Sequence, residues 1–438
     1  MATRLSDSAM YAHLWSTAEL DAVFEERARL QSWLDILVAL ARAQAGLGIV
    51  PAEAADEIAA HAKIEELELD LVVEQTRRTG HSTLGLIHGL ERVLGEQARE
   101  YVYFGATVQD VTDSWFGLVM RDVGTIVARD LAALETALLD LAQRHRNTVM
   151  AGRTHGQPGA VTTFGLKAAS WADEVFRHRE RMRQGRSRWA VGQLAGAVGT
   201  LAFYGSAGAR LRAAFCQELG LADPGISWLT ARDRVAEFGS VLAMISSTVA
   251  RIGNEIYELQ RPELGELHEP LPGVSSITMP HKRNPEISEH LDTLGRLARS
   301  SAAVLLESMV GQHERDGRTW KAEWIALPEV CLLTGAALRL ANTVVGGLEV
   351  DVAAMSRNLN PMLATEQVLA ELSSRWGKHR AQRLMHDLLR AGVTAAELPE
   401  RLAALGLAEA DEVRAWLNRQ AVDMATAMVD HVRSRAST

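Results

Sequence analysis

The chain is poor in cysteine, and its first residues do not resemble an export signal. Only two cysteines occur among 438 residues, Cys216 and Cys331, and both lie in apolar segments with helical periodicity. We expect two buried thiols rather than a disulfide or a nucleophile, which favours a reducing cytoplasm. The first residues, MATRLSDSAMYAHLW, lack the apolar core of a secretory signal, so export is not indicated.

Runs of one charge sign and long apolar runs are also missing. The 46 Lys and Arg residues against 55 Asp and Glu residues give a net charge of −9, without a basic run that would attract nucleic acid. The longest uncharged stretch, Ala190–Ala209, carries five glycines together with Gln193 and Ser206, and is too polar for a membrane span. We therefore expect no nucleic-acid partner and no membrane.

Strand signals are sparse, because few β-branched runs alternate and no Asn-Gly or Asp-Gly turn joins two of them. Apolar residues instead recur at three- and four-residue steps in Gly117–Arg146, Arg234–Gln260 and Pro285–Gln312. The last segment carries one apolar stripe, formed by Ile287, Leu291, Leu294, Leu297, Val304 and Met309. Long helices of similar length pack side by side. The sequence predicts an all-α fold with a central long-helix bundle.

Helix-breaking residues divide the chain into three predicted regions. Gly105 precedes the first very long helix, and Arg357–Pro361 (RNLNP) interrupts the pattern before an Ala- and Arg-rich tail. We predict an N-terminal helical region at 1–106, the central bundle at 107–356 and a C-terminal helical region at 357–438.

Two polar islands interrupt the first half of the chain. In Phe104–Asp113 (FGATVQDVTD), Thr107 and Gln109 stand at a helix start, where backbone N–H groups suit an anionic oxygen. Simple N-capping of the helix by Thr107 or Asp110 is the equal alternative. In Gly152–Gly159 (GRTHGQPG), His155 is the best acid/base histidine, although a solvated turn residue would look the same.

The third island, Gly265–Pro285 (GELHEPLPGVSSITMPHKRNP), carries paired serines before a cationic stretch. Lys282 and Asn284 run directly into the helix that Pro285 opens, which would aim an ammonium, an amide and a positive dipole end at one point. Such a point would stabilise a carboxylate or its aci-form, and a neighbouring serine could act as base. The alternative is a basic surface loop that caps a helix. No spacing typical of a metal site occurs, since His81 and His88 stand apart from any HExxH or paired-cysteine motif.

These islands, in this order, resemble the fumarase/aspartase superfamily. Its signature of Gly, two serines, any residue, Met-Pro, any residue, Lys, any residue and Asn-Pro is matched in Ser275–Pro285 at Ser276, Met279, Pro280, Lys282, Asn284 and Pro285. The other two islands resemble further blocks of the family. Gly192–Leu201 (GQLAGAVGTL) resembles the glutamine-bearing turn of its adenylosuccinate lyase and carboxymuconate cycloisomerase branches. The resemblance extends from about His81 to about Pro328.

The resemblance implies a cofactor-free homotetramer that acts on a small di- or tricarboxylate, with active sites shared between three subunits. Ser276 would be the general base, with Ser275 as the alternative if the alignment slips by one residue. Lys282 and Asn284 would stabilise the aci-carboxylate, and His155 would contact substrate and protonate the leaving group. The implied substrate-binding residues are His81, Thr107, Gln109, Arg153, Thr154, Gln193, Ser275, Met279 and Arg315.

The segment His313–Glu323 (HERDGRTWKAE) separates the branches of the family. Adenylosuccinate lyases continue from HER into a serine-rich stretch and a phosphate-binding arginine, whereas this chain has Trp320, Lys321 and Trp324 and is closer to the cycloisomerase branch. That branch also resembles specialised lyases that release fumarate. Whether these residues and Arg318 face the substrate or the core stays open at this point.

Three functions follow from the resemblance. The first is β-elimination from a succinyl-type dicarboxylate, with cleavage of a C–N or C–O bond and release of fumarate. The second is cycloisomerisation of 3-carboxy-cis,cis-muconate by the same residues. The third is a non-catalytic structural role, because a fold does not fix an activity.

Overall fold

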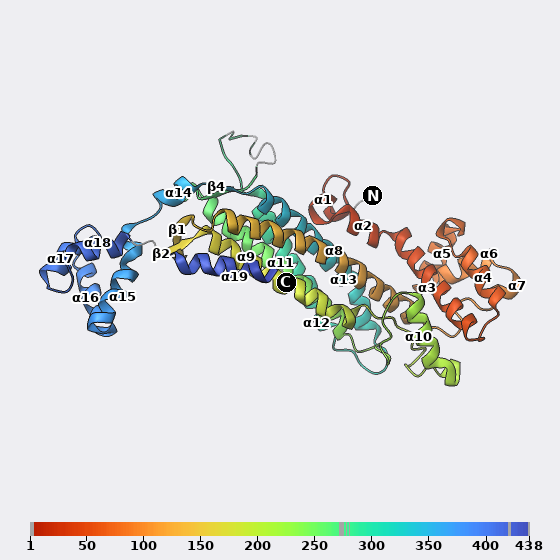
Figure 1. Cartoon of the computed structure of the whole chain (residues 1–438). Coiled ribbons are helices and arrows are strands. Elements are labelled where there is room, and N and C mark those ends of the chain that lie inside the picture. Colours follow the sequence, from red (N-terminus) through yellow and green to blue (C-terminus); the bar gives the residue numbers. More distant parts are fainter. Residues whose placement is uncertain (1–3, 271–275, 277, 280, 419–421, 437–438) are drawn as a thin grey trace. The chain divides into compact units, whose positions relative to one another are not determined.

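The protein was analysed as a computed structural model that describes residues 4–270, 276, 278–279, 281–418 and 422–436. The described residues form nineteen α-helices and two small antiparallel sheets of two strands each (Figure 1). The prediction of an all-α fold is confirmed. The two sheets were not predicted.

The N-terminal helices are α1 (Ala12–Trp15), α2 (Ala18–Phe24), α3 (Glu26–Gly46), α4 (Ala52–His61), α5 (Leu69–Thr79), α6 (Leu84–Val93) and α7 (Glu96–Arg99). The long-helix region contains α8 (Val108–Arg144), β1 (Val149–Thr154), β2 (Gln157–Thr163), α9 (Phe164–Trp189), α10 (Gly208–Glu218), α11 (Asp233–Gln260), β3 (Leu267–His268), α12 (Glu286–Glu307) and α13 (Gly317–Gly346). The chain ends with β4 (Glu349–Val350), α14 (Val352–Arg357), α15 (Thr365–Trp376), α16 (Lys378–Arg390), α17 (Leu398–Ala404), α18 (Ala410–Asn418) and α19 (Asp423–Ala436). Short 3-10 turns occur at Leu5–Asp7, Ile64–Glu66, Ala202–Ala207 and Pro361–Ala364.

The chain forms two compact units. The first comprises Met1–Leu131, His178–Ala250 and Leu291–Leu340, and the second comprises Ala132–Arg177, Arg251–His290 and Ala341–Thr438. The division into regions 1–106, 107–356 and 357–438 stays a prediction.

Helix α8 begins at Val108, earlier than the periodic segment that starts at Gly117. Its apolar stripe is fully or almost fully buried, as the period predicts, at Val119, Val123, Val127, Leu131, Leu134, Leu138 and Leu141. The first turns are also buried but carry Asp110, Asp113 and Ser114. These polar residues interrupt the three- and four-residue spacing of apolar side chains, so this spacing predicts only the later part of the helix.

Helix α11 agrees with its predicted segment, whereas α12 ends at Glu307 and not at Gln312. The stripe on α12 is buried only in its first half. Ile287, Leu291 and Leu294 are buried, but Leu297 and Val304 are each 42% exposed, as is Met309 at 43% beyond the helix end. The apolar period therefore marks a face that extends past the core of this chain.

Helices α11 and α13 are long and apolar enough to cross a membrane, but most of each is buried within the chain. Core helices meet the same criteria of length and composition, so this is weak evidence for a membrane.

Within the second unit, α15 to α18 form a cluster with its own apolar core (Figure 1). The fully buried members of this core include Val368, Leu398, Leu402 and Val413. Both cysteines of the chain, in the first unit, are buried free thiols, as predicted. Burial raises the pKa of Cys216 to about 12, so this thiol is not activated as a nucleophile.

Candidate active site

The predicted site residues fall into two groups, one in each unit. The first unit carries His81, Thr107, Gln109, Gln193 and Arg315. The second carries Arg153, Thr154, His155, Ser276, Met279, Lys282 and Asn284, while Ser275 lies outside the described residues.

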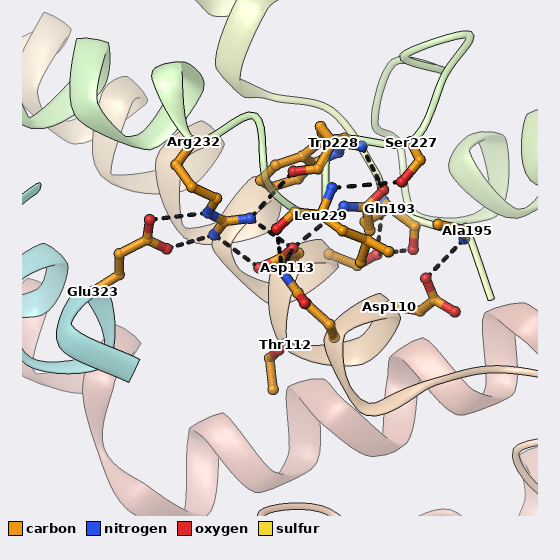
Figure 2. Close-up of polar contacts among 12 residues, drawn as sticks. Asp110, Thr112, Asp113, Gln193, Ala195, Ser227, Trp228, Leu229, Arg232 and Glu323 are labelled. Carbon is orange, nitrogen blue, oxygen red and sulfur yellow. Dashed lines mark hydrogen bonds and ion pairs between the residues drawn. The ribbon is translucent and has the colours of Figure 1, made fainter. Parts of the chain in front are cut away.

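A buried charge cluster supports the first group (Figure 2). Arg232, only 2% exposed, forms a bidentate pair with Asp113, with N–O distances of 2.8 and 3.0 Å, and a second pair with Glu323. Its guanidinium also lies 4.9 Å from the centre of the Trp228 ring. Asp113 and Glu323 are fully buried. The cluster therefore fixes the start of α8 against α11 and α13, without solvent screening of its charges.

The side chains of Gln109 and Gln193 also belong to this buried charge cluster. Both side chains are fully buried, and both amide groups donate to Asp113, at 3.0 and 3.3 Å. Gln109 also donates to the carbonyl of Leu229 at 2.7 Å, and Gln193 accepts from the N–H of Trp228 at 3.2 Å. The structure gives both glutamines a positioning role. Their contact with substrate stays a prediction.

Asp110 joins the start of α8 to the glycine-rich turn 192–199. Its carboxylate accepts from the backbone N–H groups of Thr107, Ala195 and Gly196, at 2.9, 2.8 and 3.2 Å. Burial raises the pKa of Asp110 to about 7, against the lowering effect of these three donors. Because the Thr107 N–H is bonded to Asp110, the capping alternative describes this backbone group correctly. The Thr107 side chain is hydrogen-bonded to Tyr103, and its contact with a substrate oxygen stays a prediction.

The same glycine-rich turn contacts Arg315. One guanidinium nitrogen donates to the carbonyl of Ala197 at 3.2 Å and lies 3.5 Å from that of Gly196. Gly117 allows the chain next to this turn to approach α8, since a Cβ there would lie 2.2 Å from the Val191 carbonyl oxygen. The structure thus brings the Thr107, Gln193 and Arg315 segments together in the first unit.

His81 is exposed between α5 and α6. Its Nδ1 accepts the N–H of Leu84 at 3.2 Å, so the ring caps the first turn of α6. This bond assigns the proton to Nε2, which points the donor away from α6.

The histidine island is a β-hairpin in the second unit. β1 and β2 pair from Val149↔Thr163 to Thr154↔Gln157, and His155 and Gly156 form the two-residue turn with φ of 52° and 73°. Two positive φ values define a type I′ turn, which matches the twist of a hairpin. His155 is exposed at the tip, and its role as an acid/base histidine stays a prediction. The expectation of few strands is confirmed among the described residues, and this hairpin lacked the usual Asn-Gly signal because a His-Gly pair forms its turn.

Arg153 anchors this hairpin. It forms a bidentate ion pair with fully buried Glu266, at 2.9 and 2.6 Å, and Glu266 also accepts from Asn358 at 2.8 Å. The guanidinium is therefore engaged within the chain, which gives Arg153 a positioning role. Its predicted contact with substrate stays a prediction.

The serine loop is ordered by local turns at its described end. The Ser276 hydroxyl accepts the N–H of Met279 at 3.1 Å, and the Lys282 N–H donates to the Met279 carbonyl at 3.0 Å. Lys282 is exposed and Asn284 is half-buried. These turns place the hydroxyl, the ammonium and the amide within one short segment.

The helix end that follows this loop is occupied by Glu269. The buried carboxylate accepts from the N–H groups of Ile287 and Ser288, at 3.0 and 3.1 Å, and from the Ser288 hydroxyl at 3.0 Å. Burial raises the pKa of Glu269, against these three bonds. The expectation that the α12 N-terminus would receive a substrate carboxylate is wrong, because a carboxylate of the chain already fills it.

Backbone strain coincides with the polar islands. Among the described residues, the non-glycine residues with positive φ are Tyr103, His155, Leu201 and His313, at 52° to 57°. Each lies in or beside one of the segments on which the family resemblance rests. Such conformations cost about 1–3 kcal/mol each and are retained where the local geometry has a use.

Several functional residues escaped the sequence analysis. Arg232 lies in ordinary loop sequence. Glu266 and Glu269 lie in the third polar island and Glu323 ends the segment His313–Glu323, but only their three-dimensional partners reveal the role of these residues. A charged residue in an otherwise apolar helical segment, such as Glu323 in WKAEW, was the available signal. In the part of the chain that the structure describes, no cluster of three His, Cys, Asp or Glu side chains could bind a metal ion.

The fold and these segments define a helical lyase-type protein, and comparison with known proteins identifies the family. A family model described as "Lyase" matches residues 16–297. N-acetyl-S-(2-succino)cysteine lyase of Dickeya dadantii (strain 3937) is 40% identical over 88% of this chain and 86% of its own. 3-Carboxy-cis,cis-muconate cycloisomerase of Pseudomonas aeruginosa is 38% identical over 86% and 84%. The crystal structure of the 3-carboxy-cis,cis-muconate lactonizing enzyme from Pseudomonas putida matches with a TM-score of 0.90 and 32% identity, over 98% and 99% of the two chains.

The chain belongs to this lyase family, and thus to the fumarase/aspartase superfamily.

Proposed function

We propose that the protein eliminates a leaving group from a succinyl-type dicarboxylate and releases fumarate. The observation that carries the proposal is the 40% identity, over 88% of the chain, to a protein named as a lyase of a succinyl thioether. A C–S bond therefore joins the C–N and C–O bonds as a candidate for cleavage. The signature residues Ser276, Lys282 and Asn284 support the same chemistry.

The proposed reaction begins with proton removal. The Ser276 alkoxide takes the Cβ proton, and the electron pair moves into the adjacent carboxylate, which becomes the aci-form. Lys282 and Asn284 stabilise that form by charge and by an amide hydrogen bond. The electrons then return to form the double bond of fumarate while the Cα–leaving-group bond breaks. His155 donates a proton to the departing atom.

The direct test uses purified protein with a panel of substrates. Fumarate should form from S-(2-succino)cysteine or its N-acetyl derivative, and the chromatographic fumarate peak measures turnover. Adenylosuccinate and 3-carboxy-cis,cis-muconate complete the panel. If no succinyl compound yields fumarate, and none forms from fumarate and the matching thiol or amine, the proposal is wrong.

The base assignment has its own prediction. Ser276→Ala should lower kcat by at least about 100-fold, because no other group in the mechanism removes the Cβ proton. Thr278→Ala removes a hydroxyl from the same exposed loop and serves as the matched control. Retained turnover in Ser276→Ala with lost turnover in Ser275→Ala would move the base by one residue.

The cycloisomerase function is the second candidate. It is favoured by the 38% identity to the cycloisomerase of Pseudomonas aeruginosa and by the TM-score of 0.90 to the lactonizing enzyme. Loss of carboxymuconate absorbance without release of fumarate would select it over the elimination.

We also propose that the protein is a cytoplasmic homotetramer with shared active sites. Exposed apolar side chains on three long helices support a contact between copies, namely Met244 on α11, Leu297 and Val304 on α12 and Ile325 on α13, which are 41–55% exposed. Assembly would bring the serine loop of one copy to the Thr107 segment of another.

A further inference from the structure

The first unit contains a cavity whose lining includes none of the residues assigned to the candidate site above. Its volume is about 480 Å³, within the range of small-molecule sites. The walls come from α3, α5, α8 and α13 and are largely apolar and aromatic, with Leu30, Trp33, Trp115, Phe116 and Trp324. Thr112 also lines it, on the side of α8 that faces away from Asp113 in Figure 2.

Two walls of the cavity carry polar donors without acceptors. The indole N–H groups of Trp33 and Trp324 are buried and have no hydrogen-bond partner in the described part of the chain. Trp33 is only 7% exposed. Both N–H groups are closed to solvent, so a ligand oxygen can accept from either of them only after a shift of the ring, and satisfying a buried donor without a partner favours that shift.

The charge at the cavity is positive. Three arginines, Arg27, Arg29 and Arg77, line it with one acidic residue, Glu26. Arg27 is paired with Glu65, and Arg29 is paired with Glu26, each at 3.5–3.6 Å. Arg77 is exposed and, among the described residues, has no ion-pair partner. Its guanidinium is therefore available for an anionic group of a ligand.

Two residues of the cavity lining lie close along the chain to predicted site segments. Ser82 in its lining directly follows His81, and Thr112 lies one helical turn beyond Val108 on α8. Of the residues whose orientation the sequence left open, only Trp324 lines it. Trp320 is buried and packs edge-to-face against the Trp324 ring. Lys321 is exposed, and Arg318 forms an ion pair with Asp316.

We propose that this cavity receives the leaving-group half of the substrate, and that the leaving group is an N-acylated amino acid with a large apolar or aromatic acyl chain. The acyl chain would pack on the tryptophans, the amide oxygen would accept from an indole N–H, and the carboxylate would pair with Arg77. The assignment to the leaving group rests on the proposed elimination. The binding preference itself does not.

A binding experiment separates the two. N-benzoylglycine should quench tryptophan fluorescence of the intact protein on saturable binding, and its uncharged amide should bind at least about tenfold more weakly. Arg77→Ala should lower the affinity for N-benzoylglycine to that of the amide. Arg78→Ala removes a neighbouring exposed arginine outside the lining and should leave the affinity unchanged. Trp324→Phe keeps an aromatic ring but removes the indole N–H, and should weaken both ligands equally.

Turnover then tests the leaving-group assignment. S-(2-succino)-N-benzoylcysteine should show a higher kcat/KM than its N-acetyl analogue, and Arg77→Ala should abolish the difference. Equal binding of N-benzoylglycine and its amide, or equal behaviour of Arg77→Ala and Arg78→Ala, would overturn the binding site. Binding as expected without fumarate from either thioether would leave the site in place and refute the elimination.

Discussion

Arg232 illustrates how a single residue can organise a site that it need not touch. Its guanidinium is satisfied by two buried carboxylates and one aromatic ring, so neither desolvated acid is left uncompensated. Burial raises the pKa of Glu323, and the ion pair with Arg232 counteracts that effect. The two buried acids therefore depend on this one shared cation.

We expect Arg232→Met to lower the free energy of unfolding by about 3–5 kcal/mol, because it leaves two buried carboxylates without a cation. Urea denaturation of the variant measures the loss. The triple variant R232M/D113N/E323Q, which carries no uncompensated charge, should recover part of it. A single variant as stable as the natural protein would show that the cluster carries no net stabilisation.

Asp110 should make stability depend on pH. Because its pKa is raised to about 7 in the folded chain from 3.8, the folded state binds the extra proton, and stability falls as the pH rises from about 4 to about 7. The slope is at most about 1.4 kcal/mol per pH unit. Asp110→Asn should remove this component, so denaturation at pH 5 and pH 7.5 should show a smaller fall for the variant. Equal falls would mean that Asp110 does not titrate in this range.

At the scale of elements, the backbone of His155 shapes the turn of the β1–β2 hairpin, while its imidazole is the predicted acid/base group. The turn needs two residues with positive φ, and His155 accepts this geometry at some conformational cost. Asn tolerates the left-handed region well. The hairpin can therefore be kept while the imidazole is removed.

We expect His155→Asn to retain the melting temperature of the protein and to lose about 10²- to 10⁴-fold in kcat, the usual contribution of a general acid. Steady-state kinetics on the substrate that turns over measures the change. His386→Asn makes the same substitution at an exposed position of α16 and should have no effect. Full activity in His155→Asn would remove His155 from the mechanism.

The serine loop is held by one glutamine side chain. Gln260 binds it at both described ends, accepting from the Glu269 N–H at 2.8 Å and donating to the Arg283 carbonyl at 3.3 Å. Glu269 caps α12 just beyond. The segment that carries the proposed base is therefore preceded and followed by residues that are hydrogen-bonded to Gln260.

At the scale of the whole molecule, the unburied half of the α12 stripe points to assembly. Leu297 and Val304 are seven residues apart and so lie on one face of the helix. Apolar side chains repeated on one face of a long helix favour contact with another copy.

We expect Leu297→Glu to shift the protein from a tetramer to smaller species, since it places a charge in a face that assembly would bury. Size-exclusion chromatography with light scattering measures the mass. Leu306→Glu is the matched control, because Leu306 is 52% exposed on the same helix and lies about half a turn away from Leu297. An unchanged mass for Leu297→Glu would place the contact elsewhere.

Much of the fold could be predicted from periodicity. Seven apolar positions on α8 are buried as their spacing predicts, and the bounds of α11 agree with its segment to within a residue. The early start of α8 and the hairpin at His155 could not be predicted in this way. Buried polar residues break the apolar period, and a His-Gly turn lacks the common hairpin signature.

The sequence by itself determined the helical class, the buried thiols and the chemical character of the islands around Thr107, His155 and Ser276. Only the tertiary structure decided which polar residues near them are structural. Arg232 meets partners 91 and 119 residues away in the chain, and Glu269 fills the helix end that a substrate carboxylate was expected to occupy. The local sequence pattern shows which polar side chains a segment carries. Burial and long-range hydrogen bonds then determine which of these side chains stay available for a ligand.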